Sequence, residues 1–119
     1  MATCIAVVED EPHVLELVRD VLTMDGYDCL GFNHPYQLEK LAGHPDLFLV
    51  DIMLPERTGI EVAQQLRDNG YAQTPMLAMS ASRAMVARAR ESGLFQDFLA
   101  KPFDVDQLLT VIERHVKPS

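Results

Sequence analysis

The chain has 119 residues, 48% of them hydrophobic and 24% charged, which suits one globular domain with a single core. Ten Lys and Arg against eighteen Asp and Glu give a formal net charge of -8, which argues against direct nucleic-acid binding because the phosphate backbone is repelled. No cationic leader and no apolar run of membrane-spanning length stand in the sequence, so we expect a cytoplasmic protein without membrane insertion.

The first part of the chain predicts two strands, each followed by a helix. Residues 3–8 form a short apolar run with β-branched side chains, which is typical of a strand. Apolar residues then recur at helical spacing over residues 14–22, after Pro12, which suits the first turn of a helix. Residues 27–32 predict a second strand, and a short helix is expected to begin at Pro35.

The rest of the chain continues the same alternation. Residues 47–50 are a continuous apolar run, as expected of a strand buried on both faces of a parallel sheet, and this run leads directly into Asp51. The further expected elements are a helix over 60–66, a strand over 76–79, a helix over 83–92, a strand over 95–100, and a helix over 105–116 with Asp104 as its N-cap.

Five strands alternating with five helices predict an α/β fold built from βαβ units. We expect a three-layer α/β/α sandwich in which a doubly wound, parallel, five-stranded sheet has the flavodoxin-like order 2-1-3-4-5. Ligands of such open sheets bind beyond the carboxyl ends of the strands, near the point where the strand order reverses. The residues that directly follow each strand are therefore the candidates for a functional site.

These positions hold acids, a hydroxyl and a lysine. Glu9 and Asp10 follow the first strand, Asp51 ends the third, Ser80 follows the fourth and Lys101 the fifth. Clustered carboxylates ionise together only beside a cation, and Mg²⁺ is the ion that prefers a few carboxylates with water and phosphoryl oxygens. Lys101 and Ser80 could bind the remaining phosphoryl oxygens. Asp51, central on this edge, is the candidate nucleophile.

Four segments carry this set of residues, namely VVEDEP, LVDIMLPERTGIE, MSAS and FLAKPF. In this order, and each at a strand end, they closely resemble the receiver domain of bacterial two-component response regulators, and the resemblance covers residues 1–119 as a single receiver domain. It implies that Asp51 accepts a phosphoryl group from a sensor histidine kinase or a phosphotransfer protein. It also implies Mg²⁺ held by Asp10, Asp51 and the Met53 carbonyl, with Glu9 acting directly or through water.

The resemblance also assigns the parts of a switch. Lys101 would pair with the phosphoryl group, Ser80 would be the hydroxyl drawn inward, and Phe98 the aromatic ring whose rotamer responds. The fourth helix, fifth strand and fifth helix would then form the output face toward an effector domain or a downstream protein, both unknown. The same resemblance implies a cis bond between Lys101 and Pro102 and slow hydrolysis of the protein's own acyl phosphate.

Two features depart from the commonest receiver pattern. Glu9 stands where many receivers have Asp, so metal contact there is expected through water. Phe98 lacks the hydroxyl that a Tyr would use to hold an inward ring by a hydrogen bond.

Several residues also have an ordinary structural interpretation. Glu11 suits the start of a helix, and either Ser80 or Ser82 could cap the helix over 83–92. Cys4 and Cys29 are too few for a disulfide framework, although a single bridge between them stays open. Arginines of the fourth helix facing acids of the fifth would allow a homodimer, and the residues concerned are Arg83, Arg88, Arg90, Asp104, Asp106 and Glu113.

Other functions compete with the phosphorylation switch. A hydrolase of the haloacid dehalogenase type would need a second Asp two residues after Asp51, where this chain has Met53. A flavodoxin-like FMN carrier would need a phosphate-binding loop after the first strand, where acids stand instead. A receiver-like module that binds proteins without being phosphorylated stays possible on sequence grounds.

Overall fold

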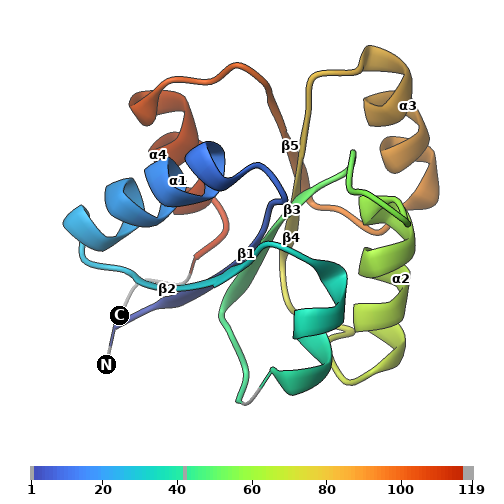
Figure 1. The fold of residues 1–119 in the computed structure, drawn as a ribbon, viewed down its shortest axis with the longest axis horizontal. Helices are drawn as coiled ribbons and strands as arrows, with labels where there is room; N and C mark the ends of the chain where they lie inside the picture. Colours follow the sequence, from blue (N-terminus) through green and yellow to red (C-terminus); the bar gives the residue numbers. More distant parts are fainter. Residues whose placement is uncertain (1, 42, 117–119) are drawn as a thin grey trace.

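The computed structural model describes residues 2–41 and 43–116 and has five parallel strands in one sheet. The strand order is β2-β1-β3-β4-β5, with helices on both faces (Figure 1), so the predicted fold class is confirmed. The strands are β1 (Cys4–Val8), β2 (Asp28–Phe32), β3 (Leu47–Asp51), β4 (Met76–Ser80) and β5 (Asp97–Ala100). The α-helices are α1 (Pro12–Met24), α2 (Gly59–Asp68), α3 (Arg83–Ser92) and α4 (Val105–Glu113).

The second predicted helix is a 3₁₀ helix, η1 (Pro35–Lys40), and not an α-helix. It has only six residues, and short segments of this length commonly take 3₁₀ geometry. His34 caps it, since the ring Nδ1 accepts a hydrogen bond from the backbone N–H of Tyr36 at 3.2 Å. The fourth and fifth helices expected from the sequence are therefore α3 and α4.

The hydrophobic core has one layer on each face of the sheet. Side chains of α1 and α4, among them Leu22 and Ile112, pack with Ile5 and Leu49 on one face. The opposite face carries α2, α3 and η1, and its core includes Phe48. All five residues of β3 are buried, as its uninterrupted apolar run predicts. Asp51 therefore ends a strand that is buried along its whole length.

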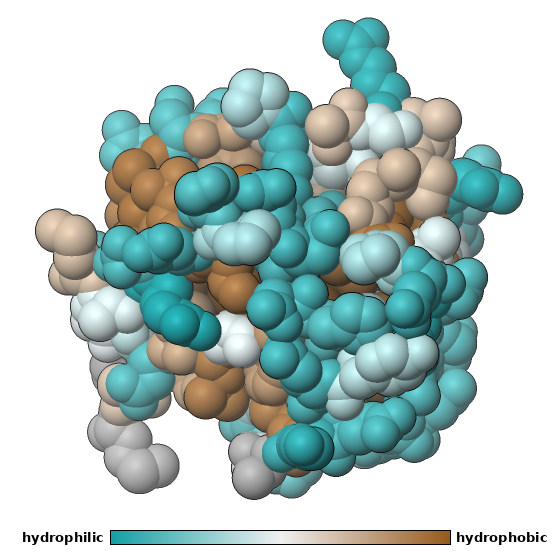
Figure 2. Space-filling model, in the orientation of Figure 1, coloured by the Kyte–Doolittle hydropathy of each residue, from teal (hydrophilic) through white to brown (hydrophobic). Residues whose placement is uncertain are grey.

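The surface is largely polar, as expected of a chain with 24% charged residues. Figure 2 shows a face that is mostly hydrophilic, with apolar side chains scattered among polar ones. Within residues 2–41 and 43–116, no helix is both long enough and apolar enough to cross a membrane.

The two cysteines are free thiols that lie on neighbouring strands. In the parallel register Cys4 pairs with Asp28, whereas Cys29 pairs with Ile5. Because successive side chains of a strand point to opposite faces, Cys4 and Cys29 belong to opposite faces of the sheet. This geometry argues against the single disulfide that the sequence left open.

A glycine allows α2 to start directly beside the end of β3. The backbone N–H of Gly59 donates to the carbonyl of Ile52 at 2.8 Å. A Cβ at Gly59 would lie 2.4 Å from the carbonyl oxygen of Asp51 and 2.7 Å from the Cα of Ile52, and both neighbours are backbone. Only glycine permits this approach, which fixes the backbone around Asp51.

We expect Gly59→Ala to lower the free energy of unfolding by about 3 kcal/mol, because backbone atoms cannot move aside for the new methyl group. The matched control is Gly31→Ala, whose Cβ would meet mainly the flexible side chain of Arg19. This control should cost less than about 1 kcal/mol. Urea unfolding of both variants measures the difference, and equal stabilities would contradict the steric role of Gly59.

Candidate functional site

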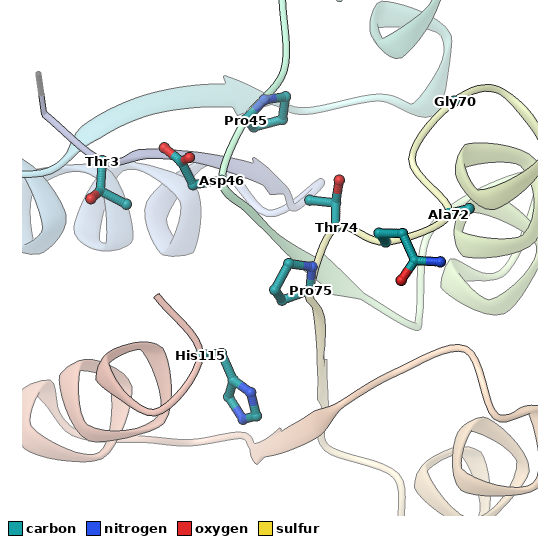
Figure 3. A pocket seen from close by; sticks show the side chains of 9 residues that line it. Thr3, Pro45, Asp46, Gly70, Ala72, Thr74, Pro75 and His115 are labelled. Carbon is teal, nitrogen blue, oxygen red and sulfur yellow. The ribbon is translucent and has the colours of Figure 1, made fainter. Parts of the chain in front are cut away.

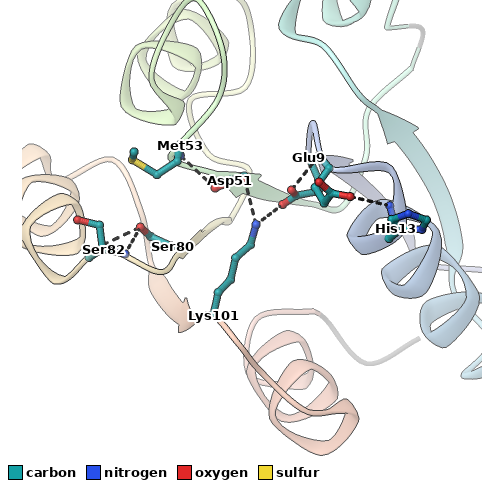
Figure 4. Close-up of polar contacts among 8 residues, drawn as sticks. Glu9, His13, Asp51, Met53, Ser80, Ser82 and Lys101 are labelled. Atoms are coloured by element: carbon teal, nitrogen blue, oxygen red, sulfur yellow. Dashed lines mark hydrogen bonds and ion pairs between the residues drawn. The ribbon is translucent and has the colours of Figure 1, made fainter.

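The three predicted carboxylates meet at the carboxyl edge of the sheet. Glu9 and Asp10 directly follow β1, and Asp51 is the last residue of β3. Figure 4 shows Glu9 and Asp51 at this edge. These strands are hydrogen-bonded neighbours with Val8 opposite Val50, so the residues that follow are brought side by side. One carboxylate oxygen from each of the three acids lies within 4.8 Å of the other two. The sequence-based expectation of a carboxylate cluster agrees with this geometry.

Lys101 reaches into this cluster from the end of β5. Its Nζ lies 2.7 Å from Oε2 of Glu9 and 3.0 Å from Oδ2 of Asp51 (Figure 4). The backbone N–H of Lys101 donates to the carbonyl of Ser80 at 3.0 Å, which fixes the start of the side chain. The Lys101–Pro102 peptide bond is cis, as the resemblance implied. One ammonium group thus joins the ends of β1, β3 and β5.

Burial and pairing shift the pKa values of Glu9 and Lys101 from their ordinary values. Glu9 is fully buried and only 3% of Asp51 is exposed. Burial raises the pKa of Glu9 to about 7. The hydrogen bond from Lys101 lowers this pKa, and the negative charge of Asp51 raises it further. Burial alone would lower the pKa of Lys101, but its hydrogen bonds to Glu9 and Asp51 raise it above its ordinary value. Lys101 therefore stays an ammonium ion.

Both oxygens of the Asp51 carboxylate have hydrogen-bond donors. The backbone N–H of Met53 donates to Oδ1 at 3.0 Å, while Lys101 contacts Oδ2. The Met53 side chain is largely exposed and points away from the buried Asp51 carboxylate, so only its backbone N–H contacts that group. The backbone of Met53 is therefore close to the acid cluster, as its expected role as a carbonyl ligand requires.

Ser80 and Ser82 have different structural roles. Ser80 is the last residue of β4 and is buried, and its Oγ accepts a hydrogen bond from the backbone N–H of Ser82 at 3.0 Å. Ser82 caps α3, since its Oγ accepts from the backbone N–H of Met85 at 3.2 Å. Ser82, not Ser80, is thus the helix cap, whereas the Ser80 hydroxyl also donates to the carbonyl of Ser82 at 3.4 Å. Glu11 caps α1 through the N–H of His13, which agrees with its expected structural role.

Phe98 lies on β5, half-buried, near the end that carries Lys101. Its ring packs against the core beneath α3, with the ring of Phe95 at 6.2 Å between centroids. The guanidinium carbon of Arg90 stands 4.3 Å from the centre of the Phe98 ring. The sequence indicated neither this contact nor the Glu9–Lys101 pair, because each depends on side chains brought together from distant elements.

A separate hollow lies at the amino ends of the strands (Figure 3). It encloses about 370 Å³ and is lined by loop residues before β1, β3 and β4, including Thr3, Asp46 and Pro75. His115 also borders it, with its ring Nε2 2.9 Å from Oδ2 of Asp97. This hollow is at the opposite edge of the sheet from the carboxylate cluster, so it is not part of that site.

The raised pKa of Glu9 predicts a pH dependence of stability in the metal-free protein. A proton is bound more tightly in the folded state, so this stabilisation is complete below the ordinary value of 4.5 and is lost as the pH rises through about 7. Glu9→Gln mimics the protonated acid, so its unfolding free energy relative to the wild type should rise by about 2 kcal/mol between pH 5 and pH 8. Urea titrations at both pH values measure this. Glu16→Gln, at an exposed position of α1, is the control, and an unchanged gap for Glu9→Gln would contradict the interpretation.

Comparisons with known proteins agree with this geometry. The family model of the response regulator receiver domain matches residues 5–113. Chemotaxis protein CheY of Bacillus subtilis is 30% identical over 118 residues, covering 96% of this chain and 98% of that protein. Transcriptional regulatory protein DltR of Streptococcus agalactiae is 35% identical over 116 residues, covering 95% of this chain and 51% of that protein. The chain thus spans about half the length of DltR and nearly all of CheY.

Solved structures share the fold. The chemotaxis response regulator CheY4 of Vibrio cholerae superposes with a TM-score of 0.87 at 20% identity, covering 98% of this chain and 100% of that one. The response regulator TrrA of Thermotoga maritima, solved in complex with Mg²⁺ and beryllium fluoride, gives 0.86 at 25% identity with the same coverage. This chain therefore belongs to the response regulator receiver domain family, the phosphoacceptor switches of two-component systems.

Proposed function

We propose that Asp51 is the phosphoacceptor of this receiver domain and takes its phosphoryl group from a sensor histidine kinase or a phosphotransfer protein. The observation that supports this most strongly is the surroundings of the Asp51 carboxylate. Its two oxygens are held by Lys101 and the Met53 backbone, and the carboxylates of Glu9 and Asp10 lie beside it. This combination of an oriented nucleophile, a fixed cation and extra acids suits phosphoryl transfer.

The acids also fit a divalent metal ion. Three carboxylates face a single ammonium group, so the cluster carries excess negative charge and offers only hard oxygen donors. We propose that Asp10, Asp51 and the Met53 carbonyl hold Mg²⁺, which supplies charge neutralisation as the acyl phosphate forms. Both Glu9 oxygens are engaged, Oε2 by Lys101 at 2.7 Å and Oε1 by the N–H of Glu11 at 3.2 Å. With both oxygens already engaged, Glu9 would act on the metal through water rather than as a direct ligand.

The transfer itself is a displacement at phosphorus. A carboxylate oxygen of Asp51 forms the new P–O bond while the P–N bond to the donor histidine breaks, and the bonding pair stays on the imidazole nitrogen. Lys101 is already 3.0 Å from Asp51 and binds the incoming phosphoryl oxygens once it releases Glu9. A water molecule later attacks the phosphorus, the P–O bond to Asp51 breaks, and inorganic phosphate leaves while the Asp51 carboxylate is restored, so the domain resets itself slowly.

The output face consists of α3, β5 and α4. The Ser80 side chain turns from Ser82 toward the phosphoryl group, and the Phe98 ring changes its rotamer. A downstream protein or effector domain binds the altered face.

Opposite charges on α3 and at α4 favour a two-fold homodimer through this face, the residues being Arg83, Arg88, Arg90, Asp104, Asp106 and Glu113. We place this switch in the cytoplasm, without direct contact to nucleic acid or insertion in a membrane.

Intact-mass spectrometry after incubation with acetyl phosphate tests the proposal. We expect one phosphoryl adduct that requires Mg²⁺, because the acids must be neutralised for Asp51 to be phosphorylated. The adduct should be absent in Asp51→Asn and present in the matched control Asp68→Asn, which changes an exposed acid of α2.

An adduct that persists in Asp51→Asn would place the acceptor elsewhere. No adduct in a folded wild-type protein with Mg²⁺ present would favour a receiver-like module that binds proteins without phosphorylation.

A further inference from the structure

Arg90 connects the last turn of α3 to the aromatic ring of β5. Its guanidinium carbon lies 4.3 Å from the centre of the Phe98 ring, within the range of a cation–π contact. Arg90 is exposed, whereas Phe98 is half-buried and has Phe95 on its inner side. The ring is therefore held between an apolar neighbour in the core and a cation at the surface.

Phe98 shares a sheet face with the proposed switch hydroxyl. The β4–β5 register pairs Phe98 with Ala78 and Ala100 with Ser80, and side chains two residues apart on a strand point to the same face. In this structure the Ser80 hydroxyl is hydrogen-bonded to the backbone of Ser82, and the Lys101 ammonium group is hydrogen-bonded to Glu9 and Asp51. The contact between Arg90 and Phe98 thus belongs to the arrangement that precedes phosphoryl transfer.

The chemistry of phenylalanine makes this contact more important than it would be for tyrosine. Phe98 has no hydroxyl group, so no hydrogen bond from its own side chain can fix the ring in either position. Packing and the negative face of the ring are the attractions that remain. The Arg90 guanidinium group over that face therefore supplies the polar attraction that a hydroxyl group would supply in tyrosine. The ring must break this contact to move toward Ser80.

We propose that Arg90 is a positioning residue that restrains the Phe98 ring in its position before transfer and so makes the switch harder to activate. This inference rests on the proposed function of Asp51. A surface cation–π contact changes a two-state equilibrium by about two- to fivefold. Removing the guanidinium group should shift the protein toward its activated arrangement by that factor, without any change at the carboxylate cluster.

The test is an NMR titration with beryllium fluoride in saturating Mg²⁺, since this complex mimics a phosphoryl group on a carboxylate. We expect Arg90→Gln to bind about two- to fivefold more tightly than the wild type. Arg88→Gln is the matched control, because it removes the same charge from an exposed position of α3 that lacks the Phe98 contact. Arg90→Lys keeps a cation and should lie between Arg90→Gln and the wild type.

The Phe98→Leu background separates the ring contact from a general effect of charge. There Arg90→Gln should have no effect beyond that of Arg88→Gln, because the aromatic partner is gone. If the wild type binds and Arg90→Gln equals Arg88→Gln, or binds more weakly, the role of Arg90 is overturned while Asp51 keeps its own. If the wild type fails to bind beryllium fluoride with Mg²⁺, the proposed function fails, and the role of Arg90 with it.

Discussion

The ammonium group of Lys101 is the interaction on which the functional edge of this fold depends. It lies 2.7 Å from a carboxylate oxygen of Glu9 and 3.0 Å from one of Asp51, and both acids are buried. Without that cation, two buried carboxylates would repel each other and the protein would take up a proton instead. The carboxyl edge of the sheet therefore concentrates negative charge that cations must neutralise. Such an edge suits a divalent cation such as Mg²⁺.

The fold makes this concentration of charge possible. The strand order reverses next to β1 and β3, so their carboxyl ends, with Glu9 and Asp51, lie side by side, and β5 brings Lys101 from the far side of β4. Gly59 lets α2 begin against the last residue of β3, which keeps the Asp51 backbone in place. Core packing on both faces of the sheet supports this edge, where the side chains of Glu9, Asp51 and Lys101 meet.

Sequence patterns predicted the fold well because burial imposes simple patterns on parallel strands and on amphipathic helices. The apolar run before Asp51 is a clear example, since all five residues of β3 are buried. The short helix expected from Pro35 is present as η1, but its 3₁₀ type was not predicted, because the spacing of apolar residues does not separate a short 3₁₀ helix from an α-helix. The direct pairing of Glu9 with Lys101, 92 positions apart, and the contact of Arg90 with Phe98 depend on side-chain geometry that no local pattern encodes.

The central claim is that the Asp51 carboxylate is the atom group that becomes phosphorylated. The most direct measurement is chemical: the acyl phosphate is reduced with borohydride, and the modified residue is located by peptide sequencing in a mass spectrometer. Reduction converts a phosphorylated aspartate to homoserine, so we expect homoserine at position 51 and unmodified acids at positions 9 and 10. Homoserine at position 10, the one-carbon-longer alcohol that a phosphorylated glutamate would give at position 9, or a reduced acid elsewhere, with position 51 unchanged, would contradict this assignment.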